Sequence, residues 1–417
     1  NELSNYLIIV MIIKNCRNCN NTNLVFLFTL GNLAFTGKFP TKSQMIPKAK
    51  LTLVMCKSCK LVQLDRNFNR NYLYGKDYGY RTGINKTMTE HVQSVVKTAC
   101  KKMKLISGDA VLDIASNDAT LLKSYKGKSI ITVGVDPLIN KYKKHYSKIN
   151  YSFSNFFSSK ILPKVLKDKK FKIITALSMF YDLPKPNLFL KDVQKILHKD
   201  GIFILEHADL YSIYKNNVFD TICHEHLEYY SSTVIFNMAK NHNLEVFDHK
   251  FNDINGGSSQ YFICHKNSKF KVNKKRIHKI MILEKKLRLT EVSAYKKFHK
   301  KILIIKNQLN SKIQEINKNN KIIHGYGAST KGNVLLQYFN IDNKALPYIA
   351  ERNPKKFNKF TPGTNIKIVS EEISRKKMPS YYLVLPWHFK NEILKREKKI
   401  RAKGCKFIFP LPKITVI

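Results

Sequence analysis

The chain lacks a hydrophobic run long enough to cross a membrane. The longest apolar run near its start, residues 7–13, is far shorter than the roughly 20 residues that a spanning helix needs. This run has no basic flank before it and no small-residue cleavage site after it, so we do not expect a signal peptide. These absences predict a cytoplasmic protein that does not bind membranes. The chain begins with Asn, and Met11 is a candidate start, so residues 1–10 are expected to have no structural role.

Acidic residues are also few, since 29 Asp and Glu stand against 74 Lys and Arg and give a formal net charge of +45. Such a balance raises nucleic acid, a membrane surface or an acidic small molecule as partners. Only about ten of the basic residues are Arg, and the Lys are spread along the whole chain rather than gathered beside stacking aromatics. We therefore interpret the charge as a composition bias, and we do not expect nucleic acid as a partner.

The 417 residues contain no internal repeat or low-complexity tract, and they divide by pattern into three regions. Residues 11–75 are expected to be loop-rich, with short apolar runs such as 51–55. Residues 76–266 alternate strand-like runs with amphipathic stretches, which is typical of a doubly wound α/β sheet. Residues 267–417 are expected to open with a helical connector at 269–320 and to continue as a second α/β unit. The expected strands are 110–114, 130–135, 171–176, 201–205, 260–264, 321–326, 345–349, 381–385 and 406–409.

Two Cys-x-x-Cys pairs stand in the first region, Cys16 with Cys19 and Cys56 with Cys59. Disulfides are not expected in a reducing cytoplasm, whereas two such pairs can complete a tetrahedral zinc site. A closed shell of four thiolates leaves no position for a substrate, so the expected role is structural. Metal binding can supply the folding free energy that a small core cannot. The other cysteines are scattered and are expected in the core or on the surface; they are Cys100, Cys223, Cys264 and Cys405.

A turn of small residues follows the first expected strand of the middle region, and an Asp-Pro pair ends the next one. In nucleotide-binding α/β folds such a turn lets the backbone approach the cofactor, and the acid that ends the second strand can accept both ribose hydroxyls. The turn has no Gly-x-Gly-x-x-Gly pattern, so it suits S-adenosylmethionine, which has no phosphate, better than a dinucleotide. An ordinary strand–turn–helix remains the alternative. The candidate cofactor-binding residues are Asp113, Ala115, Asn117, Asp118, Asp136 and Pro137.

The stretch 219–230 holds the densest group of reactive side chains, with His224, Glu225 and His226 in a row and two Tyr after them. A neutral imidazole can remove a proton near pH 7, and a nearby carboxylate can orient it. A polar surface loop is the simpler interpretation. A metal site through both His is a further one, although no third ligand stands at an obvious spacing.

These segments, in this order, resemble the C-methyltransferases that act on nucleotide-linked deoxysugars. The resemblance rests on the paired Cys-x-x-Cys segment, the Ser-Asn-Asp turn at 116–118 and the Phe-Asp-x-Ile-x-His-Glu-His stretch at 219–226. It extends over nearly the whole chain from Cys16 onward. Further matches are Tyr78–Gly83 with His91, Asn255–Ser258, Gly325–Ala328, Lys331–Asn333, Arg352–Lys355, Thr361–Gly363 and Leu385–Phe389.

The resemblance implies a class I Rossmann-like methyltransferase domain at 76–266, a zinc-binding domain at 11–75 and a Rossmann-like α/β domain at 267–417. It implies S-adenosylmethionine as cofactor, structural zinc, and a nucleotide-linked 4-keto-6-deoxysugar as substrate. His226 would remove the C3 proton to leave an enolate, and Glu225, His224, Tyr80 and Tyr78 would assist it. The implied substrate-binding residues are Cys223, Asp182, Lys331, Asn353, Trp387 and His388.

The chain departs from the family pattern at four positions. Ala115 and Ala119 stand where methyltransferase turns normally carry Gly, Cys223 stands where the family usually has Tyr, and the family usually has a His near Asp182 in the stretch 180–182. Three alternatives therefore stay open: an O- or N-methyltransferase acting on a sugar or small metabolite, a non-catalytic member with a spoiled cofactor turn, and a zinc-ribbon nucleic-acid binder. The sequence does not choose between a monomer and a dimer, nor does it identify the sugar.

Overall fold

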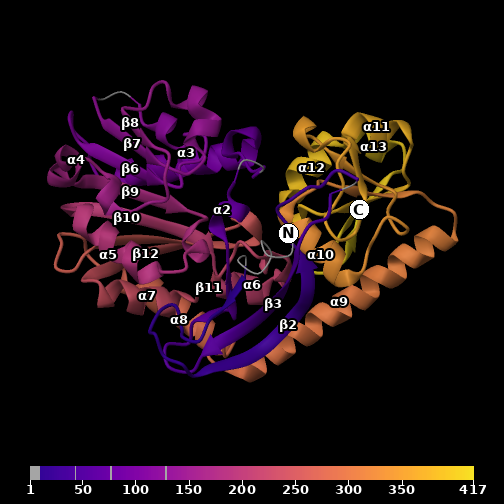
Figure 1. Cartoon of the computed structure of the whole chain (residues 1–417), viewed down its shortest axis with the longest axis horizontal. Coiled ribbons are helices and arrows are strands. Elements are labelled where there is room, and N and C mark those ends of the chain that lie inside the picture. The colour runs from indigo at the N-terminus through magenta and orange to yellow at the C-terminus, as the bar shows by residue number, and fades with distance from the viewer. Residues whose placement is uncertain (1–9, 43, 76–77, 127–128) are drawn as a thin grey trace, which may run out of the picture.

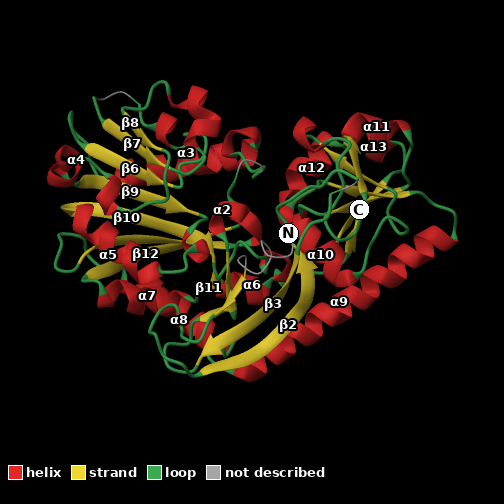
Figure 2. Ribbon diagram, in the orientation of Figure 1, coloured by secondary structure: helices red, strands yellow, loops and turns green. Residues whose placement is uncertain are grey.

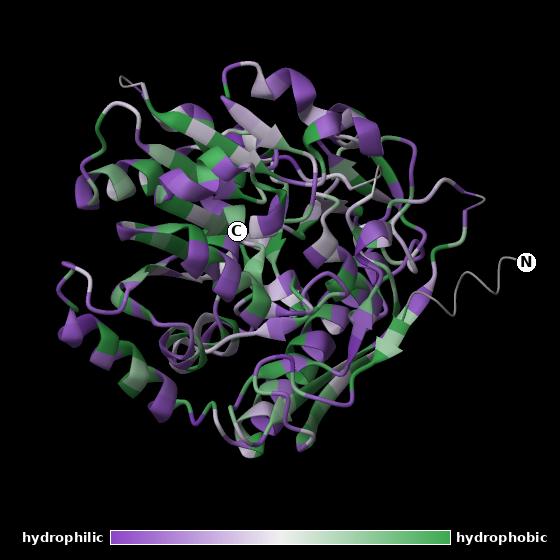
Figure 3. Ribbon diagram, turned by 60° about the vertical axis from the view of Figure 1, so that its left-hand side comes forward, coloured by the Kyte–Doolittle hydropathy of each residue, from purple (hydrophilic) through white to green (hydrophobic). Residues whose placement is uncertain are grey.

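The structure is a computed structural model of the chain that describes residues 10–42, 44–75, 78–126 and 129–417. Two large α/β units stand side by side, and a small antiparallel sheet lies against both of them (Figures 1 and 2). In Figure 3 the strands are largely hydrophobic, whereas hydrophilic residues are concentrated on the outer helices. Within the described residues, none of the helices combines the length and the apolar composition that a membrane crossing requires.

The middle unit is built on a seven-stranded sheet of order β12-β13-β10-β9-β6-β7-β8. Strand β13 is antiparallel to both of its neighbours, and the other strands run parallel to one another. This is the doubly wound sheet of class I methyltransferases, so the fold class expected from the sequence is confirmed. Its elements are α3 (Lys86–Lys102), β6 (Ala110–Ile114), β7 (Ile131–Val135), β8 (Tyr151–Phe153), α4 (Lys164–Lys169), β9 (Phe171–Leu177), α5 (Pro186–Ile196), β10 (Leu197–Ala208), α6 (Leu210–Lys215), α7 (Ser232–Asn241), β12 (Leu244–Asn252) and β13 (Ser258–His265).

The N-terminal unit is not loop-rich, and that expectation is wrong. A long antiparallel hairpin of β2 (Leu24–Ala34) and β3 (Lys48–Cys56) continues into β4 (Val62–Leu64). The fourth strand of this sheet, β11 (Glu228–Tyr229), comes from the middle of the chain and pairs with β4. Two Cys pairs and scattered apolar residues concealed the hairpin, because β2 and β3 bury their side chains without a clean alternation. The remaining elements are β1 (Val10–Ile12), β5 (Arg66–Phe68) and α2 (Arg70–Leu73).

Two helices connect the large units, as the helical spacing predicted. Helix α8 (Lys274–Lys286) is followed by α9 (Val292–Lys318), which buries one continuous stripe of side chains. Phe298 on this stripe packs against Phe28 of β2, with ring centroids 5.9 Å apart. Helix α9 therefore binds the small sheet as it runs along the edge of the molecule toward the C-terminal unit (Figure 1).

The C-terminal unit has a six-stranded sheet of order β16-β15-β14-β17-β18-β19, parallel except for the last strand. The chain order of its parallel strands reverses at β14 and β17, which is where doubly wound folds open a ligand crevice. Its elements are β14 (Ile323–Tyr326), α10 (Thr330–Phe339), β15 (Tyr348–Glu351), β16 (Lys367–Ser370), α11 (Glu371–Lys376), β17 (Tyr381–Val384), α12 (Lys390–Arg396), α13 (Lys398–Ala402), β18 (Lys406–Phe409) and β19 (Thr415–Val416).

The domain boundary predicted after residue 266 lies between secondary-structure elements. The boundary after residue 266 falls in the stretch between β13 and α8. Residue 76, the expected start of the second domain, lies outside the described residues, as do residues 1–9. Val10 pairs with Phe68 in the β1–β5 ladder, so the expectation that residues 1–10 have no structural role is wrong for Val10.

Candidate functional site

The cofactor turn adopts the backbone shape that glycine normally provides. Ala115 and Ala119 both have a φ of 60°, and Asn117 between them has 49°. A left-handed conformation costs an L-residue roughly 1–2 kcal/mol. The turn therefore forms despite its two alanines, and the backbone after β6 takes the path expected of a cofactor turn.

Two buried carboxyls lie under this turn. Asp113 accepts a hydrogen bond of 2.6 Å from the Thr175 hydroxyl, and burial raises the pKa of Asp113 to about 7. Asp136 accepts hydrogen bonds from the backbone N–H groups of Asn117 (2.9 Å) and Leu138 (2.7 Å), and burial raises its pKa as well. Asp113 lies in β6, and Asp136 directly follows the adjacent strand β7. The cofactor-binding roles expected for the two acids stay predictions.

The Tyr78–Gly83 segment is fastened to the far end of the turn. The Thr82 N–H donates to the Asn117 side chain at 2.9 Å, and the Gly83 N–H donates to Asp118 at 3.1 Å. Arg81 pairs with the same Asp118 carboxylate at 3.2 Å. Asn117 and Asp118 thus hold this segment beside the cavity. A cofactor-binding role for Asp118 itself stays a prediction.

His226 lies at the centre of the site. Its Nδ1 is 2.8 Å from the Thr221 carbonyl, which can only accept, so Nδ1 carries a proton and Nε2 is the atom with a free lone pair. The ring packs against Tyr181, with centroids 4.2 Å apart. Burial and the charge of Lys331 lower the pKa of His226 to about 3, so the imidazole is neutral at physiological pH.

The residues beside His226 are buried under it. The His224 Nε2 bonds the Ala49 carbonyl at 3.2 Å and its ring packs on Phe35, so this side chain is held by the N-terminal sheet. Cys223 is fully buried. Glu225 reaches the cavity, and burial raises its pKa.

Three units of the chain meet at Glu225. The Thr36 hydroxyl donates to its carboxylate at 3.4 Å, and Asn333 of α10 donates to the Thr36 carbonyl at 2.7 Å. Gly37 passes so close that a side chain there would collide with the Glu225 carboxylate. The N-terminal unit therefore takes part in shaping the site as well as in carrying the cysteines.

The C-terminal unit supplies the opposite wall. The Lys331 Nζ donates to the Asn255 carbonyl at 2.6 Å, and burial lowers the pKa of Lys331. The Nδ1 atom of His388 is buried and has no partner among the described residues. Trp387 lies behind it, and its Nε1–H donates to Asp220 at 2.8 Å. Asn353 caps a short turn by accepting from the Lys355 N–H.

One cavity of about 390 Å³ gathers residues from all of these elements. Asp118, Cys223, His224, Asn353 and Trp387 do not line it, so the roles expected for them stay predictions. Twelve of the candidate residues line it: Tyr78, Tyr80, Asp113, Ala115, Asn117, Asp136, Pro137, Asp182, Glu225, His226, Lys331 and His388.

Sequence reasoning assigned no role to several residues of this wall. Thr221 anchors the candidate base, Arg70 lies against the cavity from α2, and Glu206 lies in the wall where β10 ends. An acid that ends an apolar strand is a signal that could have marked Glu206. Thr221 lies inside the 219–226 motif, whose spacing could have marked it, whereas nothing in the sequence pairs Arg70 with the site, because Arg70 arrives through a tertiary contact.

The four cysteines form a metal site. Their sulfur atoms all lie within 4.8 Å of one another, with Cys16–Cys59 at 3.5 Å and Cys19–Cys56 at 3.4 Å. These separations are too long for disulfides and suit four thiolates around one zinc ion. The hydrogen bond from Cys59 lowers the pKa of Cys16 to about 5, which favours the thiolate that zinc requires. The site is a structural zinc centre, as the sequence predicted.

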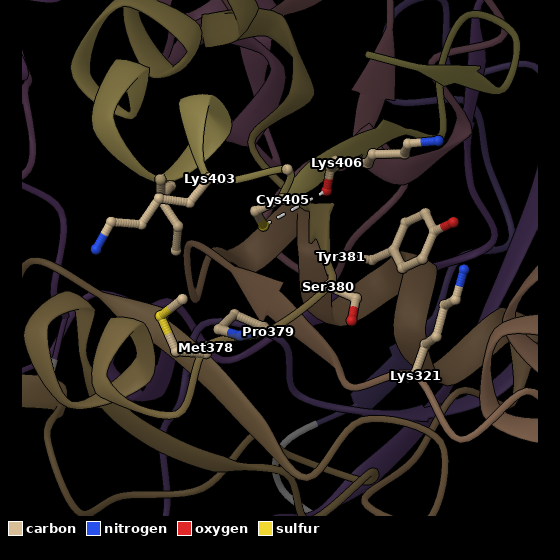
Figure 4. A pocket seen from close by; sticks show the side chains of 10 residues that line it. Lys321, Met378, Pro379, Ser380, Tyr381, Lys403, Cys405 and Lys406 are labelled. Carbon is tan, nitrogen blue, oxygen red and sulfur yellow. Dashed lines mark hydrogen bonds between the residues drawn. The ribbon is translucent and has the colours of Figure 1, made fainter.

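A second hollow, of about 260 Å³, lies at the opposite edge of the C-terminal sheet (Figure 4). Ser380 and Tyr381 stand there at the start of β17, and Lys406 stands at the start of β18. Doubly wound folds bind their ligands at the carboxyl ends of the strands. This hollow at the amino ends is therefore not the counterpart of the main cavity.

Comparison with known proteins agrees with this architecture. Three family models match the chain in order: a proposed zinc-binding domain at residues 16–74, a methyltransferase domain at 84–249, and a C-methyltransferase C-terminal domain at 253–412. The C-methyltransferase NovU of Streptomyces niveus is 26% identical over 88% of this chain and 87% of its own length.

Two solved methyltransferase structures each cover less than half of this chain. An S-adenosylmethionine-dependent methyltransferase from Clostridium acetobutylicum ATCC 824 is 14% identical, with 42% of this chain and 92% of that chain covered, at a TM-score of 0.34. Magnesium protoporphyrin IX methyltransferase from Synechocystis PCC 6803 is 12% identical, with 47% and 92% covered, at a TM-score of 0.34. Likenesses this low support no inference about the site.

The ordered succession of matched domains, the methyltransferase sheet and the cysteine cluster lead to one assignment. The chain is an S-adenosylmethionine-dependent methyltransferase whose zinc-binding, methyltransferase and C-terminal domains are similar to those of C-methyltransferases.

Proposed function

We propose that the enzyme methylates C3 of a nucleotide-linked 4-keto-6-deoxyhexose. The observation that carries the proposal is His226, a neutral imidazole with a fixed tautomer in a cavity that both large units line. The likeness to a C-methyltransferase and the motif order of the deoxysugar family support the choice of acceptor.

The ketone at C4 acidifies the neighbouring C3–H. His226 Nε2 accepts that proton, and the electron pair it leaves forms an enolate with its charge on the C4 oxygen. S-adenosylmethionine supplies the methyl group, which bonds to C3 as the carbon–sulfur bond breaks. The net change is one C–H bond exchanged for one C–CH₃ bond, with one proton released. Thr221 holds the imidazole in the required tautomer throughout.

A base with a pKa near 3 is weak, and the structure indicates how substrate would strengthen it. The charge of Lys331 is one of the two causes that lower the pKa of His226. A diphosphate bound beside Lys331 would offset that charge, so the pKa of His226 would rise when the nucleotide-sugar is in place. The proton acceptor is thus expected to become effective only in the substrate complex.

The hydroxyl groups of the cavity can act as hydrogen-bond donors. A phenol has an ordinary pKa of about 10, so the partly exposed Tyr80 keeps its proton at physiological pH. Burial raises the pKa of Tyr78 well above that value. A donor aimed at a developing oxyanion is worth roughly 3 kcal/mol in other enzymes. We assign these two tyrosines to the sugar and its C4 oxygen.

Two residues point to an acceptor that differs from those of better-known members. Asp182 lies in the cavity wall with one carboxylate oxygen unpartnered among the described residues, and Cys223 lies buried behind it. Both replace larger or basic side chains of the family pattern. We infer a sugar with different substituents near the reacting carbon.

Because the enzyme needs four reduced thiolates, we keep the cytoplasm as its expected compartment.

Mass spectrometry of the enzyme with S-adenosylmethionine and a panel of nucleotide-linked 4-ketosugars tests the proposal. We expect one added methyl group and loss of deuterium from a C3-labelled substrate. His226→Ala should abolish transfer while S-adenosylmethionine still binds, and His278→Ala, which changes an exposed histidine of α8, should have no effect. Equal activity of His226→Ala and the unaltered enzyme contradicts the assignment of the base. Methylation on oxygen or nitrogen contradicts the C3 acceptor.

A further inference from the structure

A second histidine in the cavity wall has no task in the reaction described above. His91 of α3 places its Nε2 2.5 Å from the Glu206 carboxylate of β10. The two side chains are 11% and 1% exposed. Both residues line the cavity. A buried carboxylate–imidazole pair facing a substrate cavity is an arrangement that orients a ring for work at its other nitrogen.

The carboxylate is held on both oxygens. Its second oxygen accepts from the Gln260 side chain at 2.7 Å and from the Asn252 side chain at 3.1 Å. A carboxylate saturated with donors has no freedom to turn. Because its oxygens accept, the His91 Nε2 carries a proton. Among the described residues, Nδ1 of His91 has no hydrogen-bond partner, so this nitrogen remains available to a ligand.

The pair lies on the acceptor side of the sheet. Strand β9 lies between β10, which carries Glu206, and β6, which carries Asp113. Two strand spacings, about 10 Å, therefore separate the strand of Glu206 from that of Asp113. A chain of contacts connects it to the base. The Ser178 N–H donates to the Glu206 carbonyl at 2.7 Å, and Asn255 donates to the Ser178 hydroxyl at 3.3 Å.

The same Asn255 accepts the hydrogen bond from Lys331, whose charge acts on His226. His91, Ser178 and Asn255 therefore form one continuous part of the cavity wall, which ends beside His226. Among the described residues, this part of the wall includes neither of the candidate cofactor-binding acids, Asp113 and Asp136. The group that meets His91 is then a part of the acceptor molecule.

We propose that Nδ1 of His91 hydrogen-bonds an oxygen of the acceptor sugar and that Glu206 is its positioning residue. The inference rests on the proposed function, since it takes the acceptor to be a sugar. His91 makes and breaks no covalent bond in this role. It fixes the sugar so that C3 faces His226, and it thereby selects acceptors with an oxygen at that place.

His91→Gln separates this role from a structural one. The glutamine amide can still donate to Glu206, but no polar atom replaces ring Nδ1. We expect KM for the ketosugar to rise about tenfold, the effect of one lost hydrogen bond, with unchanged thermal stability and unchanged affinity for S-adenosylmethionine. The matched control is His278→Gln, an exposed histidine on α8, which should leave all three quantities unchanged.

Glu206→Gln provides an independent test. Its amide has one acceptor oxygen where the carboxylate uses two, so a donor is left facing a donor either at His91 or at Asn252 and Gln260. The side chain then holds His91 less firmly, and KM should rise in the same direction. An active enzyme whose KM is unchanged in both variants overturns the inference and leaves the proposed function intact. A parallel loss of cofactor affinity or of thermal stability also overturns it, because it shows a structural role. An unaltered enzyme that binds S-adenosylmethionine but methylates no ketosugar overturns the proposed function, and this inference with it.

Discussion

Replacing Arg17, which lies in the zinc loop between Cys16 and Cys19, should destabilise the fold. The Arg17 side chain is 2% exposed and stands 3.6 Å from Glu228, which is fully buried. It also donates to the carbonyls of Leu64 at 2.7 Å and Arg66 at 2.8 Å. Neither oxygen of Glu228 has a hydrogen-bond partner among the described residues. Burial raises the pKa of this carboxyl, and the charge of Arg17 opposes that rise.

Arg17→Met removes this charge and keeps the length of the side chain. Leaving one member of a buried ion pair without its partner costs about 3–5 kcal/mol. We expect the free energy of unfolding to fall by that amount. Arg17→Met/Glu228→Leu should recover about half of it, because an apolar pair needs no counter-charge but the carbonyls of β4 and β5 stay without their donor.

Urea unfolding followed by circular dichroism measures both variants, with zinc content determined in parallel. The four cysteines are unchanged, so zinc stoichiometry should stay at one. Arg288→Met is the control, since Arg288 forms an exposed pair with Glu291, and it should leave the transition where it is. A loss below about 1 kcal/mol in Arg17→Met, or no recovery in the double variant, would refute the reasoning.

Two further predictions concern the cofactor turn. Burial gives Asp113 a pKa of about 7 in the free protein, so a cation that binds beside it below pH 7 must displace a proton. The affinity for S-adenosylmethionine, measured by calorimetry, should therefore rise up to tenfold per pH unit from pH 5.5 to 7 and level off above pH 7. Asp113→Asn should flatten this pH dependence. Ala115→Gly relieves the left-handed strain of the alanine but raises the conformational entropy of the unfolded chain, so the free energy of unfolding should change by less than about 1 kcal/mol. Ala110→Gly, inside β6, relieves no strain and should lower the free energy of unfolding by about 1 kcal/mol or more. Equal losses at both positions would contradict the strain argument.

The sequence predicted most of the fold where apolar runs are bounded sharply. The expected strands 110–114 and 406–409 coincide with β6 and β18, because charged or turn-forming residues stop both runs. The helical connector was predicted correctly because the apolar residues of α9 recur at helical spacing and form its buried stripe. The hairpin of β2 and β3 was missed, because its burial follows the packing of α9 and the middle unit as well as its own alternation.

The site was predictable in its dense motifs and not in its long-range contacts. Two Cys-x-x-Cys pairs specify a metal cluster by spacing alone, and the structure brings their sulfurs together. His226 stood out among polar neighbours. The Thr36 and Gly37 contacts with Glu225 did not, because these residues reach the site through folding rather than through sequence proximity.

The origin of strand β11 affects how the protein is made. The small N-terminal sheet is complete only when residues 228–229 pair with β4. At roughly 5–20 residues per second, the ribosome needs on the order of 10–30 s after finishing β4 before β11 leaves it. During that interval β4 presents a free edge of the kind that recruits other strands. Production of this enzyme should therefore depend on chaperones or on slow, cool expression, and a fragment that ends after the zinc domain should aggregate.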